Sequence, residues 1–143
     1  MKAIGSLLIV LALVAAVVPQ FSDCESQGRA LTLENGKTVA MKCHWTSEAS
    51  LAVALPLFLV GGLAYFGKRK ETLRALGLLG LVLGAFLIAL PTVLIGVCSV
   101  PEMICNSIMR PTLIFTGALS VLGSAALLFM NLKNEPISTE RPA

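Results

Sequence analysis

Charged residues are scarce in this chain. Only 13% of its 143 residues are Asp, Glu, Lys or Arg, whereas 56% are hydrophobic and the mean hydropathy is +0.85. Soluble domains carry about 25% charged residues. The composition therefore excludes an ordinary soluble protein and indicates a chain that lies in a bilayer, with a length that suits one domain.

The long apolar runs contain no charge at all. No Asp, Glu, Lys, Arg or His falls within residues 3–18, 51–66, 76–97 or 112–131. Ionisable side chains at membrane depth mark proton relays and ion paths, so their absence argues against an autonomous ion pump or a proton-coupled carrier. A P-loop, a dinucleotide fingerprint and a paired-carboxylate pattern are also missing. We therefore expect that the protein is not an enzyme.

The four apolar runs are each close to the length of about 20 residues that crosses a bilayer. They predict an all-α membrane protein, a four-transmembrane-helix bundle made of two helical hairpins. The first run lacks the A-x-A pattern of a cleaved signal peptide before Pro19, so we expect it to be retained. The expected limits are helices at about 3–20, 49–67, 75–97 and 111–131, outer loops at 21–48 and 98–110, a transmembrane domain at 1–132 and a disordered cytoplasmic tail at 133–143.

Basic residues give the expected orientation, because Lys and Arg near helix ends stay in the cytoplasm. The short loop between the second and third runs reads GKRKETLR, and Lys2 and Lys133 fall on the same side. This predicts a multi-pass protein of the cell membrane with both termini cytoplasmic. The net charge of +3 follows from this topology, so no nucleic-acid partner is expected.

All four cysteines fall between the apolar runs, on the side predicted to be outside. Each half of the chain has a cysteine followed by an MxC motif, Cys24 with MKC at 41–43 and Cys98 with MIC at 103–105. This degenerate repeat suggests two parallel hairpins related by an axis along the membrane normal. The outer loops of the two hairpins are then expected to meet at one place.

The cysteines allow three interpretations. Disulfides persist outside the cytoplasm, and the simplest pairs are Cys24 with Cys43 and Cys98 with Cys105, although a pair across the halves such as Cys24 with Cys98 is also open. A reactive thiol pair is the second interpretation. The third is a copper, zinc or haem site, because thiolate, thioether and imidazole favour soft metals; its candidate ligands are Cys24, Met41, Cys43, His44, Cys98, Met103 and Cys105.

Small residues suggest how the helices pack, since helices in lipid approach closely through Gly, Ala and Ser. The predicted packing residues are Gly77, Gly80 and Gly84 in the third helix and Gly117, Ser120 and Ser124 in the fourth. One such face could instead dock a partner helix. In the first outer loop, Asn35-Gly36 between short β-capable runs predicts a small β-hairpin.

MKCHW at 41–45 and the IGVC…PEMIC arrangement at 95–105 carry a family resemblance. In these strings the chain resembles domain of unknown function 4418, a bacterial and archaeal family of small four-helix membrane proteins. The resemblance covers all but the tail and implies a bundle with a cysteine-bearing outer face. It also implies an association with ABC-type permeases, and hence an accessory subunit, but no activity.

Two functions are therefore weighed. The first is a non-enzymatic membrane protein with a disulfide-stapled outer head, an accessory or interaction subunit that binds another membrane protein or a second copy of itself. The second is an outer-face metal or thiol-redox protein in which the two cysteine motifs converge. The sequence identifies no cofactor for either.

Overall fold

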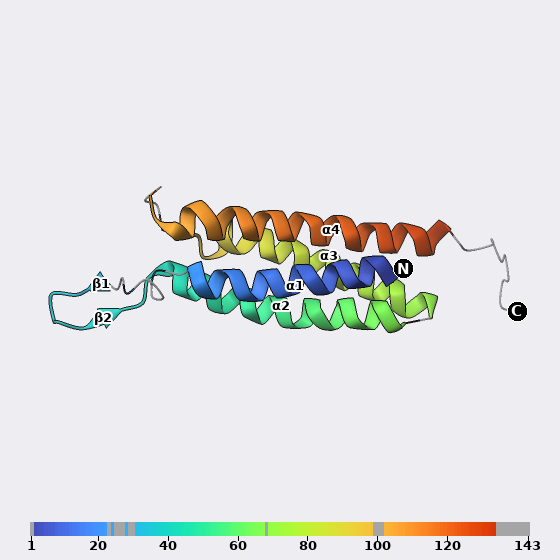
Figure 1. Ribbon diagram of the computed structural model, residues 1–143, viewed down its shortest axis with the longest axis horizontal. Coiled ribbons are helices and arrows are strands. Elements are labelled where there is room, and N and C mark those ends of the chain that lie inside the picture. The colour runs from blue at the N-terminus through green and yellow to red at the C-terminus, as the bar shows by residue number, and fades with distance from the viewer. Residues whose placement is uncertain are drawn as a thin grey trace, which may run out of the picture.

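The computed structural model describes residues 2–22, 24, 28, 31–67, 69–98 and 102–133. Within these residues four long helical segments lie side by side in an elongated bundle (Figure 1). They are α1 (Lys2–Ser22), α2 (Lys42–Phe66), α3 (Lys70–Ala89) extended by the π-helical turn η1 (Leu90–Leu94), and α4 (Arg110–Lys133) preceded by the π-helical turn η2 (Cys105–Met109). Each segment is long and apolar enough to cross a membrane. The predicted four-helix membrane fold is confirmed.

Three helical segments begin earlier than the apolar runs predicted. The second starts at Lys42 instead of 49, the third at Lys70 instead of 75, and the fourth at Cys105 instead of 111. Hydropathy marks the part of a helix that suits lipid, whereas the helix itself continues through polar residues. Cys43 and Cys105 therefore lie on helices, although the predicted loops at 21–48 and 98–110 included both.

The bundle consists of two hairpins, as predicted, with α1 packed along α2 and α3 along α4. Gly84 and Gly117 face each other across the second hairpin, where a Cβ added to Gly84 would lie 3.1 Å from the Gly117 carbonyl oxygen. A Cβ on Gly80 would collide with the Ser124 side chain, and one on Gly77 would lie 3.3 Å from the Ser124 carbonyl oxygen. Five of the six predicted packing residues therefore lie between α3 and α4 rather than on a face open to a partner helix. Their small size allows the two backbones to approach closely.

The sixth predicted packing residue, Ser120, is fully buried and donates its hydroxyl hydrogen to the Thr116 carbonyl oxygen at 2.8 Å. Thr116 donates in the same way to Thr112, one helical turn earlier. Such bonds satisfy a hydroxyl inside its own helix. The hydroxyls of Thr116 and Ser120 thus need no partner from outside the bundle.

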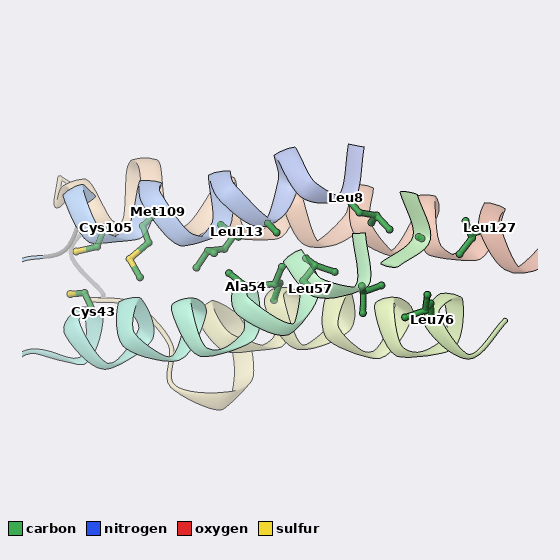
Figure 2. Packing of buried hydrophobic residues seen from close by; sticks show 14 of the residues in the cluster. Leu8, Cys43, Ala54, Leu57, Leu76, Cys105, Met109, Leu113 and Leu127 are labelled. Atoms are coloured by element: carbon green, nitrogen blue, oxygen red, sulfur yellow. The ribbon is translucent and has the colours of Figure 1, made fainter. Parts of the chain in front are cut away.

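The apolar core runs along the bundle axis and includes Leu8, Leu57, Leu113 and Leu127 (Figure 2). At one end the core continues into cysteine and methionine side chains, and this end is here called the cysteine end. The first residue of α1 and the last of α4 both lie at the opposite end (Figure 1), as an even number of crossings requires.

A two-stranded hairpin projects beyond the cysteine end (Figure 1). Strand β1 (Leu31–Thr32) pairs antiparallel with β2 (Thr38–Val39), in the segment where the Asn-Gly signal predicted it. Gly36 has a φ of 73°, a left-handed conformation that glycine adopts without steric cost. The predicted disordered tail lies outside the described residues from position 134 onward.

Candidate functional site

Each helical segment contributes one cysteine to the same end of the bundle. Cys24 follows the last turn of α1, Cys43 lies in the first turn of α2, Cys98 follows η1, and Cys105 opens η2. The four sulfur atoms all lie within 4.8 Å of one another. The two halves of the chain therefore meet at a single cluster of thiols, here called the four-cysteine site.

The sulfur atoms form a continuous series of short contacts. Cys98 Sγ lies 2.7 Å from Cys43 Sγ, which lies 2.9 Å from Cys24 Sγ, which in turn lies 3.0 Å from Cys105 Sγ. Cys24 Sγ and Cys98 Sγ are 3.8 Å apart. All four cysteines are free thiols in the structure, so the predicted disulfides stay a prediction.

Two π-helical turns position the cysteines of the second hairpin. In η1 the Ile95 N–H donates to the Leu90 carbonyl oxygen, five residues back, and in η2 the Arg110 N–H donates to that of Cys105. Each turn contains or adjoins a proline, Pro91 or Pro111, which has no N–H for the regular α-helical bond. Turns of this kind are frequent at functional sites, and here they set the rotation of the segments that carry the sulfurs.

A hydrogen bond between the hairpins fixes the segment that carries Cys98. The Thr46 hydroxyl donates to the Gly96 carbonyl oxygen at 2.8 Å. Thr46 lies about one turn after Cys43 on α2, and Gly96 precedes Cys98 by two residues with a φ of 79°. This bond holds Cys98 against the start of α2, and neither its donor nor its acceptor stood out in the sequence.

The site is largely removed from water. Cys24 is 2% exposed and Cys43 and Cys105 are 0% exposed, whereas Cys98 is half-buried. Burial, together with the neighbouring Cys43 sulfur, raises the pKa of the Cys24 thiol well above its usual range and that of Cys98 to about 11. At neutral pH these two thiols are therefore protonated unless a cation replaces the proton.

Methionines surround the cluster. Met109 is fully buried beside Cys43 and Cys105, whose side chains lie opposite each other at the end of the core (Figure 2). Met41 and Met103, both predicted as candidate ligands, are half-buried and pack against the same core cluster. The methionines thus add apolar, polarisable side chains to the core that holds the buried cysteines.

His44 does not belong to the group of converging ligand atoms, which among the described residues comprises the four cysteines. The side chains of adjacent helical residues point about 100° apart. When the Cys43 side chain is directed at the other sulfurs, the His44 side chain is therefore directed away from them. Its ring instead packs edge to face with Trp45, at a centroid distance of 5.8 Å. Of the predicted metal ligands, the structure therefore brings together the cysteines and leaves His44 aside.

The donor set fits a small thiophilic ion. Four thiolates around Zn²⁺ at about 2.3 Å place their sulfurs about 3.8 Å apart in a tetrahedron, close to the Cys24–Cys98 distance and within the 4.8 Å limit of the cluster. The shorter contacts need to open by about an ångström for this geometry. Tetrahedral sulfur sets select zinc or iron–sulfur centres rather than Mg²⁺ or Ca²⁺, and four sulfurs this close leave no space between them for a porphyrin.

A polar cavity of about 210 Å³ opens beside Cys98. Cys98 itself contributes to its wall, together with Pro91, Thr92, Gly96, Val97, Asn106 and Arg110. Arg110 is exposed, and its Nη1 donates to Asn106 Oδ1 at 3.5 Å. The sequence offered no signal for this cavity, because its walls come from two segments joined only by the fold.

Comparison with known proteins gives the family. No curated protein and no solved structure matches this chain. The profile of a domain of unknown function, DUF4418, matches residues 3–130, which include nearly all of the four helical segments and all four cysteines. The chain therefore belongs to the DUF4418 family.

Proposed function

We propose that this protein is a non-catalytic membrane protein whose cysteine end binds one Zn²⁺ ion through Cys24, Cys43, Cys98 and Cys105. The observation that carries the proposal is the convergence of four sulfurs, one from each helical segment, within 4.8 Å. A single ion coordinated by all four would tie the four helix ends together. Closed four-thiolate sites stabilise folds rather than activate water, which agrees with the expectation that the protein is not an enzyme.

A shared metal accounts for the contacts of Cys24 better than two separate disulfides within the halves. Cys24 Sγ lies 2.9 Å from its partner in the same half, Cys43, and 3.0 Å from Cys105 of the other half. A disulfide engages one neighbour and excludes the other, whereas a tetrahedral ion bonds every sulfur at once. The burial of the site also suits a structural ion, since a dry and apolar shell excludes competing water ligands.

We place the cysteine end outside the cell membrane and both termini in the cytoplasm. Supporting this orientation, Arg69, Lys70 and Arg74 lie at the opposite end of the bundle, at the start of α3. Lysine and arginine at helix ends are retained in the cytoplasm. The site would then bind its metal from the extracytoplasmic side.

Two disulfides across the halves are the second candidate. Two contacts pair all four sulfurs without overlap, Cys43 with Cys98 at 2.7 Å and Cys24 with Cys105 at 3.0 Å. In an oxidising compartment these pairs would join the two hairpins and form the stapled head. The predicted pairing within halves is less favoured, because it would leave the shortest of these contacts, Cys43 with Cys98, unused.

In either state, we propose that the head serves recognition of another membrane protein, as an accessory subunit of a complex such as an ABC-type transporter, or of a second copy. The β-hairpin supports this role, because it projects beyond the bundle (Figure 1). The apolar side chains of Leu33 and Val39 are exposed there. An exposed pair of strands can also accept a further strand from a partner. Purification from native membranes in mild detergent should retain such a partner, and a protein recovered alone as a monomer would contradict this role.

The metal content of the purified protein tests the main proposal. We expect one zinc per chain after purification without added metal, and four thiols that react with an alkylating reagent much faster after a chelator removes the ion. The double variant Cys43→Ser with Cys98→Ser serves as the control and should bind none. A wild-type mass lower by four hydrogens, with no metal and no reactive thiol, would instead establish the two disulfides, and peptide mapping would identify the pairs.

A further inference from the structure

The four cysteines differ in their access to solvent. Cys24, Cys43 and Cys105 are each at most 2% exposed, whereas Cys98 is half-buried. A reagent dissolved in water therefore reaches Cys98 before any other sulfur of the site. Access by way of the core is closed, since Met109 and Leu113 behind the cluster are both fully buried.

The polar cavity supplies the approach to Cys98. It holds about 210 Å³ and lies between the Pro91–Cys98 segment and the start of the fourth helical segment, so a group of several heavy atoms fits in it. Among the described residues of its wall, Arg110 alone carries a formal charge, and its guanidinium keeps most of its five donors beyond the one bond to Asn106. Thr92 and Asn106 add polar side chains. A carboxylate or sulfonate is the chemistry that this wall complements.

We propose that Cys98 is the thiol through which the four-cysteine site reacts with solutes, and that the polar cavity admits small anionic disulfides, such as those of carboxylate-bearing low-molecular-weight thiols. This inference deepens the proposed function, since it concerns the same four sulfurs, but it applies equally to the metal-free thiols.

The short contact between Cys98 and Cys43 determines which disulfide the reaction leaves on the protein. Cys98 Sγ gives up its proton and attacks one sulfur of the small disulfide, whose S–S bond breaks and releases one small thiolate that takes up a proton. Cys43 Sγ, 2.7 Å away, then attacks Cys98 Sγ and releases the second small thiolate, which leaves a Cys43–Cys98 disulfide. Two protein thiols have then lost two electrons and two protons, and the small disulfide has gained both as two thiols. A zinc ion held by the site loses two of its four ligands in the process.

Paired charged reagents test the assignment on the full-length protein in detergent. The purified protein, both zinc-loaded and reduced metal-free, is treated with a negatively charged methanethiosulfonate and with its positively charged analogue. Each rate is divided by the rate of the same reagent with a free small thiol, and peptide mass analysis identifies the first cysteine modified. We expect Cys98 to be modified first in both forms, and the normalised rate to favour the anion by about three- to tenfold, because one cation within several ångströms has this effect near a protein surface.

Matched variants separate charge from structure. Arg110→Gln should abolish the preference for the anionic reagent, whereas Arg110→Lys should keep most of it. Cys98→Ser should lose the modification that occurs first in the wild-type protein. First modification at Cys24, Cys43 or Cys105, or an unchanged preference in Arg110→Gln, would overturn the inference. Absence of zinc from the purified protein would overturn the proposed metal site alone, because the metal-free form is measured separately.

Discussion

Single residues of the four-cysteine site differ in what they contribute. Cys24, Cys43 and Cys98 each contact at least two other sulfurs at 3.8 Å or less, and of these three Cys98 is the one that borders the polar cavity. Met41 and Met103 are half-buried and pack against the apolar core, which includes Cys24, Cys43 and Cys105. In the proposed zinc site the thiols would be the ligands, and the methionines would only shield them.

Substitution of a ligand should therefore be distinguishable from substitution of a shielding residue. We expect Cys43→Ser to weaken zinc binding by more than about 100-fold, since loss of groups that only orient a ligand already costs about 10- to 100-fold. Met103→Leu, which conserves volume, should change the affinity by less than about threefold, as expected for a packing residue. Competition titration with a chromophoric chelator measures both. Equal losses in the two variants would show that the thioether is itself a ligand, as in a copper site.

Glycines offer a second comparison between two residues of one type. A Cβ at Gly84 would lie 3.0 Å from the backbone nitrogen of Val121, whereas a Cβ at Gly62 would meet nothing within 4 Å. Gly84→Ala should therefore destabilise the protein by about 1–3 kcal/mol through overpacking of α3 against α4. Gly62→Ala should be neutral or slightly stabilising, because alanine is the better helix former. Thermal unfolding in detergent measures the difference, and similar midpoints for both variants would contradict this packing.

At the scale of elements, the two π-helical turns connect a regular bundle to a specific site. Cys105 opens η2, and Cys98 follows η1 by four residues. A π turn inserts one residue into a helix and so rotates the residues before the turn relative to those after it. The packing of α3 and α4 is fixed by small residues along their length, so the turns decide where the sulfurs point.

Deletion of one residue from η2 tests this relation. Removal of Ser107, an exposed residue of the turn, should restore regular α-helical spacing and rotate Cys105 by about 100° relative to α4. The variant should still fold as a bundle but lose tight zinc binding. Ser107→Ala, which keeps the spacing, should bind zinc like the wild type. Zinc content and helicity by circular dichroism measure the two properties, and normal zinc binding by the deletion variant would show that the turn does not position the ligand.

At the scale of the whole molecule, a metal at the cysteine end would act as a clamp across four helix ends. The bundle otherwise joins its two hairpins through the contacts of α1 with α4 and of α2 with α3, which are less extensive than those within each hairpin. A ligand that binds only the folded protein stabilises it by mass action. The clamp therefore links the weaker interface of the bundle to the occupancy of the site.

Zinc should accordingly raise the thermal stability of the protein. At free zinc about 100 times the dissociation constant, the gain in unfolding free energy is about 2.7 kcal/mol, and a chelator should reverse it. The unfolding midpoint in detergent with and without chelator measures the effect. Cys43→Ser is the control and should show no zinc-dependent shift, whereas a shift of the same size in that variant would assign the stabilisation to another site.

Orientation in the membrane is the second property of the whole molecule that can be measured. A membrane-impermeant thiol reagent applied to intact cells, after an impermeant chelator, should modify Cys98 and leave Glu71→Cys unmodified, because Glu71 is exposed at the opposite end of the bundle. Inverted membrane vesicles should give the reverse pattern. Modification of the introduced cysteine from outside would place the termini outside as well.

Local sequence signals account for much of the fold. The apolar runs predicted the four helices, and the Asn-Gly pair predicted the hairpin of β1 with β2. They did not predict that α2 begins at Lys42, because hydropathy falls where the helix leaves the lipid although its hydrogen bonds continue. That error placed Cys43 in a loop, when its position in the first turn of a helix is what directs it at the other sulfurs.

The sequence by itself determined the class of the protein, since the free energy of transferring an apolar run into lipid depends on the run alone, and it determined that the cysteines fall between the runs. Only the tertiary structure decided that four cysteines make one site, because Cys24 reaches Cys105 across 81 residues through the packing of separate helices. It also decided that His44 is outside the site and that, of the four cysteines, Cys98 borders the polar cavity. The rotation of each helix about its own axis determines which side chains lie in the site. Contacts between different helices set that rotation, and the sequence of one apolar run does not specify them.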